Sequence, residues 1–345
     1  MTAQTTQRPV HLVGSVPLAD EEAVFRAAST TLGDHLKRIP DGETGIRTNW
    51  IGWQTAVFAR NPSLEPVPDT GKEYGQLVQY RLRPGADGND IAFDNLGYAD
   101  AAIASYQTFA RLKQEGVIPA ATRFLVCLPT PLAPVTAFIE QASQPAIEPP
   151  YEAQMLAEVD RICAAIPHDQ LAIQWDTAVE FAIWESVGWQ SHLDDVRSGI
   201  IDRLVRIGEH VPPDVEMGYH LCYGDAGHKH FVQPKDAANL VTVANAASAR
   251  VTRPINWIHM PVPRERDDEA FFAPLSNLSL HPETELYLGL VHYTDGVAGA
   301  RKRIATAQRF VPTFGIATEC GFGRRPPETV APLMEIHRDV ANDAD

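Results

Sequence analysis

The sequence of 345 residues is long enough for one large α/β barrel or for two domains of ordinary size. Its formal net charge of -15 at pH 7 argues against nucleic acid and an anionic membrane as partners, because binding a phosphate surface requires a basic face. The four cysteines lack the paired spacing of a disulfide framework, and no apolar stretch is long enough for a secretory signal or a membrane span. We therefore expect a cytoplasmic protein with no nucleic-acid or membrane partner.

Eight apolar segments with the character of strands follow one another along the chain. Amphipathic stretches separate them, for example residues 20–33 and 297–311, in which apolar residues recur at helical spacing. Strands and helices that alternate in this way predict an α/β fold, a (β/α)8 TIM barrel, and a doubly wound sheet is the alternative. The eight segments are residues 11–16, 35–40, 123–129, 171–175, 215–222, 255–262, 285–292 and 313–320.

Residues 61–95 interrupt the alternation. They are too long and too rich in proline and glycine for an ordinary connection, so they predict an excursion with a short hairpin near the barrel mouth. The sequence has no internal repeat, low-complexity segment or interdomain linker. We therefore expect one domain over residues 1–345.

The barrel prediction places the chemistry at the carboxyl ends of the strands. Seven of the eight segments end in glycine, carboxylate, histidine or cysteine motifs, as a barrel active site requires. In chain order, these motifs are GSVP, PDGETG, QWD, HLC, HMPVPR, HYTDG and ECGFGRR.

His220 and Cys222 are two residues apart at the end of the fifth segment. Side chains alternate between the faces of a strand, so both point the same way, and both are good ligands for a soft metal ion. The alternative is that Cys222 packs as a small hydrophobic residue and His220 is a core histidine.

Several motifs in order from residue 14 to residue 325 resemble a known family. GSVP, DGETGIR, LPTPLAPVT, QWD, HLCY and ECGFGRR are similar to landmarks of the catalytic barrel of cobalamin-independent methionine synthase. The wider superfamily also contains uroporphyrinogen decarboxylase. The resemblance implies a zinc site with His220, Cys222 and Cys320 as ligands. The residues agree, because Cys320 ends the last strand and would face the fifth strand across the mouth of a closed barrel.

The resemblance identifies the fourth zinc ligand less directly than the other three. In the methionine synthases a glutamate from the next strand completes the site, and His259 stands at the comparable place here. We expect His259 as the fourth ligand, which makes a zinc site with two thiolates neutral. The alternative is a polar strand-end residue without a metal role. Glu319 is a poorer candidate, because alternation points it away from Cys320.

The resemblance also implies a binding site for a thiol substrate. It places the polar groups of the thiol against Gly14 and Ser15, and it assigns an ammonium group to Glu43 and Asp176 if the thiol is an amino acid such as homocysteine. The alternatives are structural. Asp176 would cap the following helix, and Glu43 would sit in a glycine-rich turn.

The sequence departs from the family pattern at a position expected to bind the alkyl donor. Where folate-dependent members carry a tryptophan that stacks on the pterin, this chain has Glu140, which disfavours an anionic folate polyglutamate. His292 and Asp295 are candidates for a general acid and base pair, although Asp295 is equally suited to capping a helix. Three strand-end arginines would bind a carboxylate or sulfonate, or else pair with nearby acids: Arg264, Arg324 and Arg325.

These patterns predict a zinc-dependent methyl- or alkyltransferase that uses Zn²⁺ to activate a thiol as a thiolate. The expected partners are a small-molecule thiol and an alkyl donor, with a corrinoid protein as a candidate donor. The alternatives are a zinc-dependent thiol-epoxide transferase or lyase, a metal-free enzyme like uroporphyrinogen decarboxylase, and an inactive protein that binds metal or corrinoid.

Overall fold

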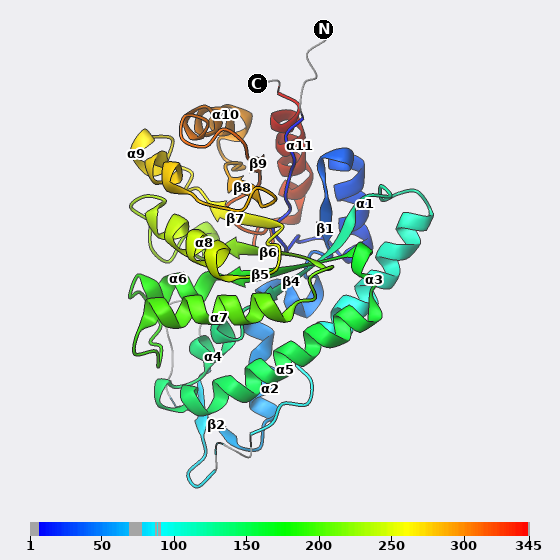
Figure 1. Ribbon diagram of the computed structural model, residues 1–345. Helices are drawn as coiled ribbons and strands as arrows, with labels where there is room; N and C mark the ends of the chain where they lie inside the picture. The colour runs from blue at the N-terminus through cyan, green and yellow to red at the C-terminus, as the bar shows by residue number, and fades with distance from the viewer. Residues whose placement is uncertain (1–6, 69–77, 87, 89–90, 344–345) are drawn as a thin grey trace.

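The computed structural model describes residues 7–68, 78–86, 88 and 91–343. A parallel sheet lies at the centre, helices surround it, and the two ends of the described chain lie near each other beside α11 (Figure 1). The strands are β1 (Arg38–Pro40), β2 (Leu64–Pro66), β3 (Tyr80–Leu82), β4 (Arg123–Pro129), β5 (Leu171–Thr177), β6 (Glu216–Leu221), β7 (Trp257–Pro261), β8 (Glu285–Gly289) and β9 (Gly315–Ile316).

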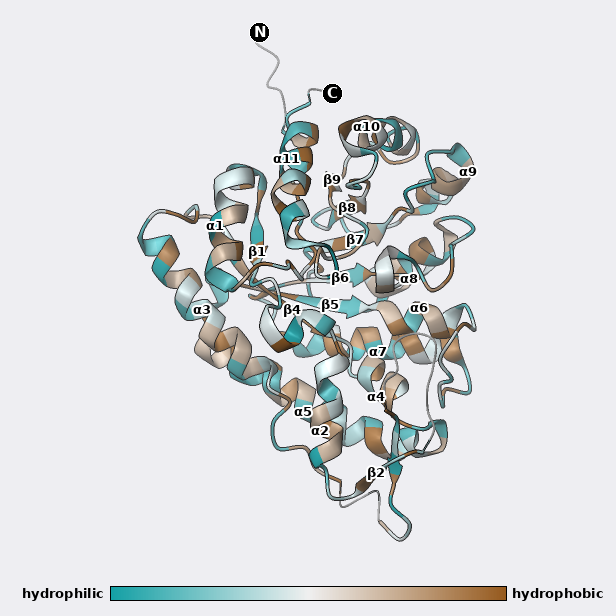
Figure 2. Cartoon of the chain, turned by 180° about the vertical axis from the view of Figure 1, so that it is seen from behind, coloured by the Kyte–Doolittle hydropathy of each residue, from teal (hydrophilic) through white to brown (hydrophobic). Residues whose placement is uncertain are grey.

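The helices form a layer outside the sheet and carry both hydrophobic and hydrophilic residues (Figure 2). Their hydrophobic sides bury residues such as Phe25 and Phe109 against the strands, which removes apolar surface from water. They are α1 (Glu21–Leu32), α2 (Thr55–Arg60), α3 (Tyr98–Gln114), α4 (Leu132–Phe138), α5 (Gln144–Ala165), α6 (Ala178–Trp184), α7 (Val196–His210), α8 (Ala238–Arg250), α9 (Glu269–Phe272), α10 (Gly296–Ala307) and α11 (Val330–Ala341).

Seven strands pair in parallel in the order β1-β4-β5-β6-β7-β8-β9, and the sheet is curled. The alternation of strands and helices therefore predicted the α/β class and the parallel sheet. The expectation of a closed barrel with eight strands was wrong for the described residues, which contain seven strands in this sheet.

The missing strand is the one expected at residues 11–16. Val10 alone makes single-residue parallel bridges, to Leu36 ahead of β1 and to Ile316 in β9. Beyond His11 the chain leaves the strand pattern, because other groups satisfy its backbone. The side-chain amide of Gln174 donates to the Val13 carbonyl over 2.6 Å, and the Val16 amide donates to the Gly42 carbonyl over 2.8 Å.

A charged cluster occupies the amino-terminal end of the sheet. Arg38 is 4% exposed, and its guanidinium donates to Glu216 over 2.5 Å and to Glu285 over 3.2 Å. The same guanidinium lies 4.1 Å from the ring centre of Trp257, in the interior of the curled sheet. These ion pairs therefore fill the interior of the curled sheet at this end.

The excursion predicted at residues 61–95 contains the expected strand pair. β2 and β3 are antiparallel, with Leu64 opposite Leu82. They lie at the far end of the molecule from the termini (Figure 1). Residues 69–77, 87 and 89–90 of the excursion lie outside the described residues.

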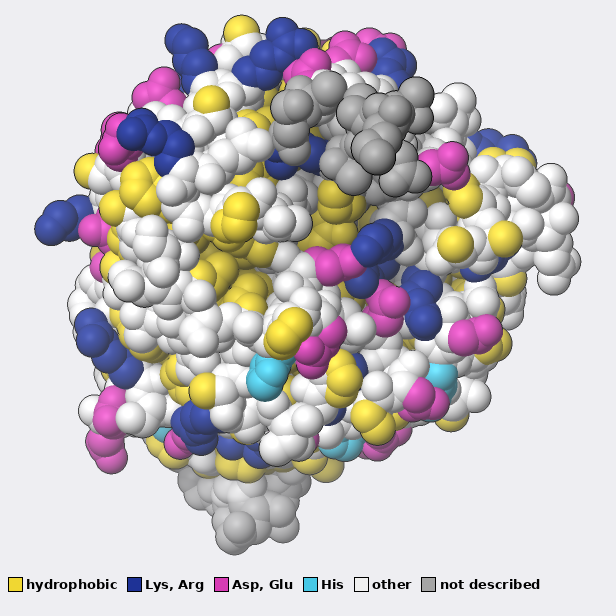
Figure 3. All heavy atoms as spheres, turned by 45° about the horizontal axis from the view of Figure 1, so that its top comes forward, with side chains coloured by type: hydrophobic (Ala, Val, Ile, Leu, Met, Phe, Trp, Pro, Cys, Tyr) yellow, Lys and Arg dark blue, Asp and Glu magenta, His cyan; other side chains and the backbone are white. Residues whose placement is uncertain are grey.

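Acidic and basic side chains are interspersed over the face in Figure 3, with hydrophobic side chains between them. Among the described helices, none combines the length and the apolar character that crossing a bilayer requires.

Candidate functional site

A cavity of about 180 Å³ lies at the carboxyl ends of the strands. Segments far apart in sequence form its wall: the chain after Val10, the turn after β1, the ends of β5 and β6, and the loop after β9. Of the ten site residues predicted from sequence, seven line this cavity: Gly14, Ser15, Glu43, Asp176, His220, Cys222 and Cys320. The placement agrees with chemistry at the strand ends.

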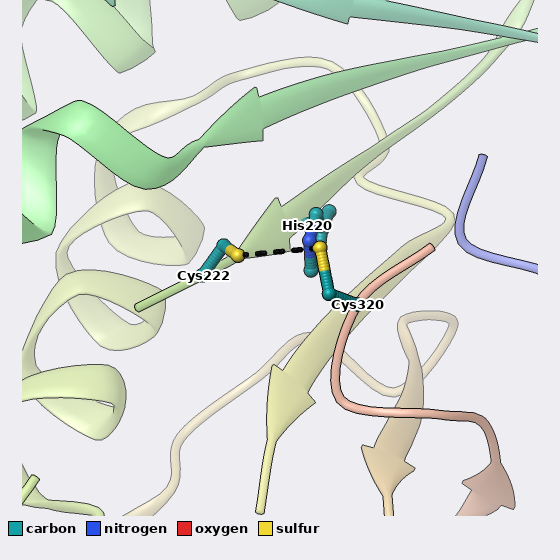
Figure 4. A group of neighbouring side chains, drawn as sticks. All are labelled: His220, Cys222 and Cys320. Atoms are coloured by element: carbon teal, nitrogen blue, oxygen red, sulfur yellow. Dashed lines mark hydrogen bonds between the residues drawn. The ribbon is translucent and has the colours of Figure 1, made fainter. Parts of the chain in front are cut away.

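His220, Cys222 and Cys320 form a compact group. One ring nitrogen of His220 and the two sulfur atoms lie within 4.8 Å of one another. His220 belongs to β6, Cys222 follows the end of that strand, and Cys320 comes from the loop after β9 (Figure 4). The alternation expected for His220 and Cys222 therefore brings both into one cavity, and Cys320 completes the group from the last strand, as expected.

The loop after β9 is fixed on both sides of Cys320. The Ala317 amide donates to the Leu288 carbonyl over 2.9 Å, which continues the pairing with β8. On the other side, the Phe322 amide donates to the Ser15 carbonyl over 2.6 Å. A Cβ added to Gly321 would lie 2.5 Å from the Ser15 hydroxyl oxygen, so only glycine allows this approach.

The two thiols of the group differ in acidity. The Cys222 thiol donates to the Cys320 sulfur across 3.7 Å (Figure 4), and this hydrogen bond lowers the pKa of Cys320 to about 5. The same contact, together with burial, raises the pKa of Cys222. Arg324 places a guanidinium nitrogen 3.7 Å from the Cys320 sulfur, and it also donates to Asp225. Of the two thiols, that of Cys320 is therefore the more acidic.

His259 lies behind His220 and outside the group of three. Its Nδ1 is 2.7 Å from Nδ1 of His220, and its Nε2 donates to the Thr318 carbonyl over 2.9 Å. Both ring nitrogens of His259 are thus engaged in hydrogen bonds. His259 contacts His220 and is not part of the group of three, whereas the sequence led us to expect it as the fourth ligand.

Glu43 and Asp176 stand together in the cavity wall, and both have a raised pKa. Desolvation raises the pKa of Glu43 to about 7, and the nearby Asp41 carboxylate adds to this. Burial, and then the neighbouring Glu43, raise the pKa of Asp176 well above its ordinary value. Two carboxyl groups of this kind gain from a cationic ligand, because its charge compensates for their loss of water.

Both acids are held by specific partners. Asp176 accepts a hydrogen bond from the Gln174 amide over 2.9 Å and another from the Trp50 side chain. The Ser15 side chain is hydrogen-bonded to Glu43. Ser15 therefore lies within reach of an acid in the wall, next to Gly14.

The turn that carries Glu43 and Trp50 is strained. Glu43 has φ 49° and Trp50 has φ 46°, in a region that residues with a Cβ seldom adopt. Asp41 holds the turn, since it accepts from the Glu43 amide and from the Arg47 guanidinium. Strain held in this way is typical of residues placed for function.

The predicted pair of His292 and Asp295 is not assembled in the cavity. Nε2 of His292 donates to the Val262 carbonyl over 2.9 Å, while its Nδ1 lies 3.7 Å from Glu319. Asp295 forms two hydrogen bonds with the buried guanidinium of Arg303. Neither residue lines the cavity described above.

The other residues singled out in the sequence are spread over several places. Glu140 is half-buried and is not among the residues that line the cavity, and its backbone amide donates to the Tyr80 carbonyl in β3. Arg264 pairs with Glu265 at the surface. Of the three arginines, Arg324 lines the cavity.

Sequence reasoning missed the aromatic wall of the cavity. Trp50, Trp189 and Phe231 line it, and the rings of Trp189 and Phe231 meet edge to face at 6.3 Å. Trp189 and Phe231 lie in connections rather than at strand ends. Trp50 could have been identified as a candidate from the sequence, because it follows the DGETG turn by a few residues.

Comparison with known proteins identifies solved structures of similar architecture. A B12-independent methionine synthase from Shewanella sp. W3-18-1, solved in complex with selenomethionine, aligns with a TM-score of 0.63 over 97% of this chain and 97% of that chain, at 14% identity. A methyltransferase from Methanosarcina mazei aligns with a TM-score of 0.57 over 96% of this chain and 94% of that chain, at 10% identity. No family model matches the sequence, and no curated protein matches it. The chain therefore shares the fold of a B12-independent methionine synthase and of a methyltransferase.

Proposed function

We propose that the protein is a zinc-dependent transferase that moves a methyl or other alkyl group to the sulfur of a thiol substrate. The observation that carries the proposal is the group of His220, Cys222 and Cys320, which shares one cavity with the carboxyl groups of Glu43 and Asp176. The fold shared with a methionine synthase and a methyltransferase supports methyl transfer in general.

The residues present fit a zinc ion. One imidazole nitrogen and two sulfurs are ligands that zinc prefers, and three protein ligands are usual where a position is kept for substrate. Nε2 of His220 is buried and has no nitrogen or oxygen partner among the described residues, and the His220 ring interacts with the Cys320 sulfur, as a ligand pair around one ion would. Zinc bound there would stabilise a substrate thiol as its thiolate and so supply a nucleophile at neutral pH.

The remaining cavity residues bind and orient the thiol substrate. Glu43 and Asp176 would take the ammonium group of an amino-acid thiol, and Ser15 with the backbone of Gly14 would bind its other polar groups. The substrate sulfur then attacks the alkyl carbon in line from about 3 to 3.5 Å. The proton of the thiol is released to solvent when the thiolate forms. The new carbon–sulfur bond forms as the bond between that carbon and the donor atom breaks, and the donor atom keeps the electron pair.

The donor would approach from the apolar side of the cavity. Trp50, Trp189 and Phe231 suit a small electrophile, such as a methylated compound, a corrinoid-bound methyl group or an epoxide. Opening of an epoxide by the same thiolate is therefore the second candidate function. A metal-free decarboxylase would leave the group of His220, Cys222 and Cys320 without a role.

Metal analysis and a donor screen test the proposal together. Protein purified without chelators should carry about one zinc per chain. Homocysteine should then be alkylated by at least one small donor. Cys320→Ser should lose the zinc, whereas Cys163→Ser, a matched change at a buried cysteine of α5 outside the cavity, should keep it.

Two results would count against the proposal. One is wild-type protein that holds no transition metal and takes none up on reconstitution. The other is alkyl transfer at an unchanged rate after the metal has been removed.

A further inference from the structure

His220 and His259 face each other from neighbouring strands. They are aligned in the register of β6 and β7, their ring centres are 4.7 Å apart, and their Nδ1 atoms are 2.7 Å apart. A contact this short between two imidazole nitrogens is a hydrogen bond, in which one nitrogen carries the proton and the other accepts it.

The Thr318 carbonyl determines the direction of that hydrogen bond. A carbonyl oxygen only accepts, so Nε2 of His259, 2.9 Å away, carries a proton. His259 is fully buried, and its ring lies against another imidazole and this carbonyl, where a positive charge would be costly. Its Nδ1 is therefore the acceptor, and Nδ1 of His220 is the donor.

We propose that His259 is a positioning residue rather than a metal ligand, and that it holds His220 in the tautomer whose free Nε2 binds the metal. The inference rests on the proposed zinc site and assigns a different role to the residue expected as its fourth ligand. Nε2 of His220 is one of several buried nitrogens without a nitrogen or oxygen partner among the described residues, and the ring contacts the Cys320 sulfur in the group of three, as a nitrogen left free of His259 would. Metal-binding histidines commonly donate their second ring nitrogen to a fixed acceptor.

The loop after β9 links this positioning to Cys320. Thr318 anchors His259 through its carbonyl, and its hydroxyl donates to the Cys320 carbonyl over 2.6 Å. One short segment thus supplies a sulfur ligand and fixes the ring behind the nitrogen ligand. A shift of this segment would disturb both ligands together.

The consequence is a site with three protein ligands. With His259 held by Thr318 and His220, the described residues offer one nitrogen and two sulfurs at this place, and the next position is left for the substrate. A thiol substrate would then bind without displacing a side chain.

Two substitutions of His259 separate the two roles. His259→Asn keeps an oxygen acceptor near the place of Nδ1, but a carboxamide is not a usual zinc ligand. His259→Leu removes the acceptor. His337→Leu serves as the control, because it also removes a buried histidine, one whose Nδ1 contacts the Leu333 carbonyl in α11. Urea unfolding of each metal-free variant establishes that it is folded.

The first readout is zinc affinity, measured by competition with a chromophoric chelator. His259→Leu should weaken binding by roughly ten- to a hundredfold, as expected for damage to a group that orients a ligand. His259→Asn should stay close to wild type, and His337→Leu should match it. Equal, large losses in the Asn and Leu variants would overturn the inference, because they are the signature of a direct ligand.

The second readout needs no metal. Two-dimensional ¹⁵N NMR of histidine-labelled apoprotein should show His220 protonated at Nδ1 and His259 protonated at Nε2. Protonation of His220 at Nε2 would overturn the inference even if zinc binds. Wild-type protein that binds no zinc, but shows the expected tautomers, would instead defeat the proposed function and leave the positioning contact intact.

Discussion

Gly289, at the end of β8, lies against the backbone of Glu319. A Cβ added to Gly289 would stand 2.7 Å from the Glu319 Cα and 2.9 Å from the Thr318 carbonyl oxygen. Real Cβ atoms do not approach other atoms this closely, and the atoms concerned are backbone rather than the ends of flexible side chains. The absence of a side chain at Gly289 therefore allows the loop that carries Cys320 to take its position.

Gly289→Ala should weaken zinc binding through displacement of this loop. We expect a loss of roughly tenfold or more in zinc affinity, because the Cys320 sulfur and the Thr318 carbonyl would move together. Gly199→Ala in α7 is the control, since the nearest neighbours of its Cβ would be the ends of the flexible Leu193 and Arg203 side chains. Unchanged zinc affinity in a folded Gly289→Ala variant would show that the loop yields without moving the ligands.

Glu43 makes the stability of the protein depend on pH. Its folded-state pKa of about 7 is above the ordinary value of 4.5, so the folded state holds this proton more tightly than the unfolded chain does. This contribution to the free energy of unfolding is complete below about pH 4.5 and is lost as the pH rises through about 7. The difference corresponds to at most about 3 to 4 kcal/mol, reduced by solvent in the cavity.

Glu43→Gln should therefore give a flatter stability curve between about pH 4.5 and pH 7 than wild type, measured by urea unfolding at several pH values. Glu180→Gln is the matched variant. Glu180 is buried in α6, its pKa is also raised to about 7 by burial, and it does not line the cavity. Both variants should flatten the curve, but only Glu43→Gln should weaken binding of homocysteine. Equal homocysteine affinity in the two variants would remove Glu43 from the binding site.

The central strands were predictable because they are buried on both faces. β4 spans the residues expected for it, and β5 extends two residues past the expected segment. Strands buried on both faces have nearly continuous apolar sequences, which can be recognised without the structure. The first and last segments were overestimated. At residues 11–16 the carbonyl of Val13 is satisfied by the side chain of Gln174, a contact across the sheet that no local pattern reveals.

One part of the candidate site was likewise predictable from the sequence, and another part was not. Strand alternation indicated that His220 and Cys222 share a face, and the carboxyl end of the last strand brought in Cys320. The role of His259 depends on Thr318, 59 positions away, and that of Trp50 on a hydrogen bond to Asp176. Both depend on how loops cross the ends of the strands, which apolar periodicity does not encode.

Trp50 should contribute to binding of the thiol substrate through Asp176. Trp50→Phe keeps an aromatic ring in the cavity wall but removes the N–H that is hydrogen-bonded to the carboxyl group. Because hydrogen bonds to charged groups contribute about 1.5 to 3 kcal/mol, we expect a loss of roughly tenfold or more in homocysteine affinity, measured by calorimetry on the zinc form. Trp53→Phe, a nearby tryptophan that packs against Tyr98 and does not line the cavity, should bind as wild type does. Equal affinity of Trp50→Phe and wild type would mean that Asp176 does not depend on this contact.

The last prediction concerns the alkyl donor, which we expect to be something other than a folate polyglutamate. By the sequence resemblance, Glu140 stands where folate-dependent methionine synthases carry a stacking tryptophan, and its backbone amide donates to the Tyr80 carbonyl of β3. Because Glu140 does not line the cavity and a carboxylate has no stacking surface, this position gives a pterin no support, and its negative charge opposes the glutamate tail of the folate. The zinc form with homocysteine should therefore react faster with S-methylmethionine, methylcobalamin or epoxypropane than with methyltetrahydrofolate triglutamate, in initial rates at equal donor concentration. Glu140→Gln should leave that order unchanged, because removing the charge does not restore a stacking ring. A folate rate equal to or above the rates with the smaller donors and the corrinoid would show that the inference from Glu140 is wrong.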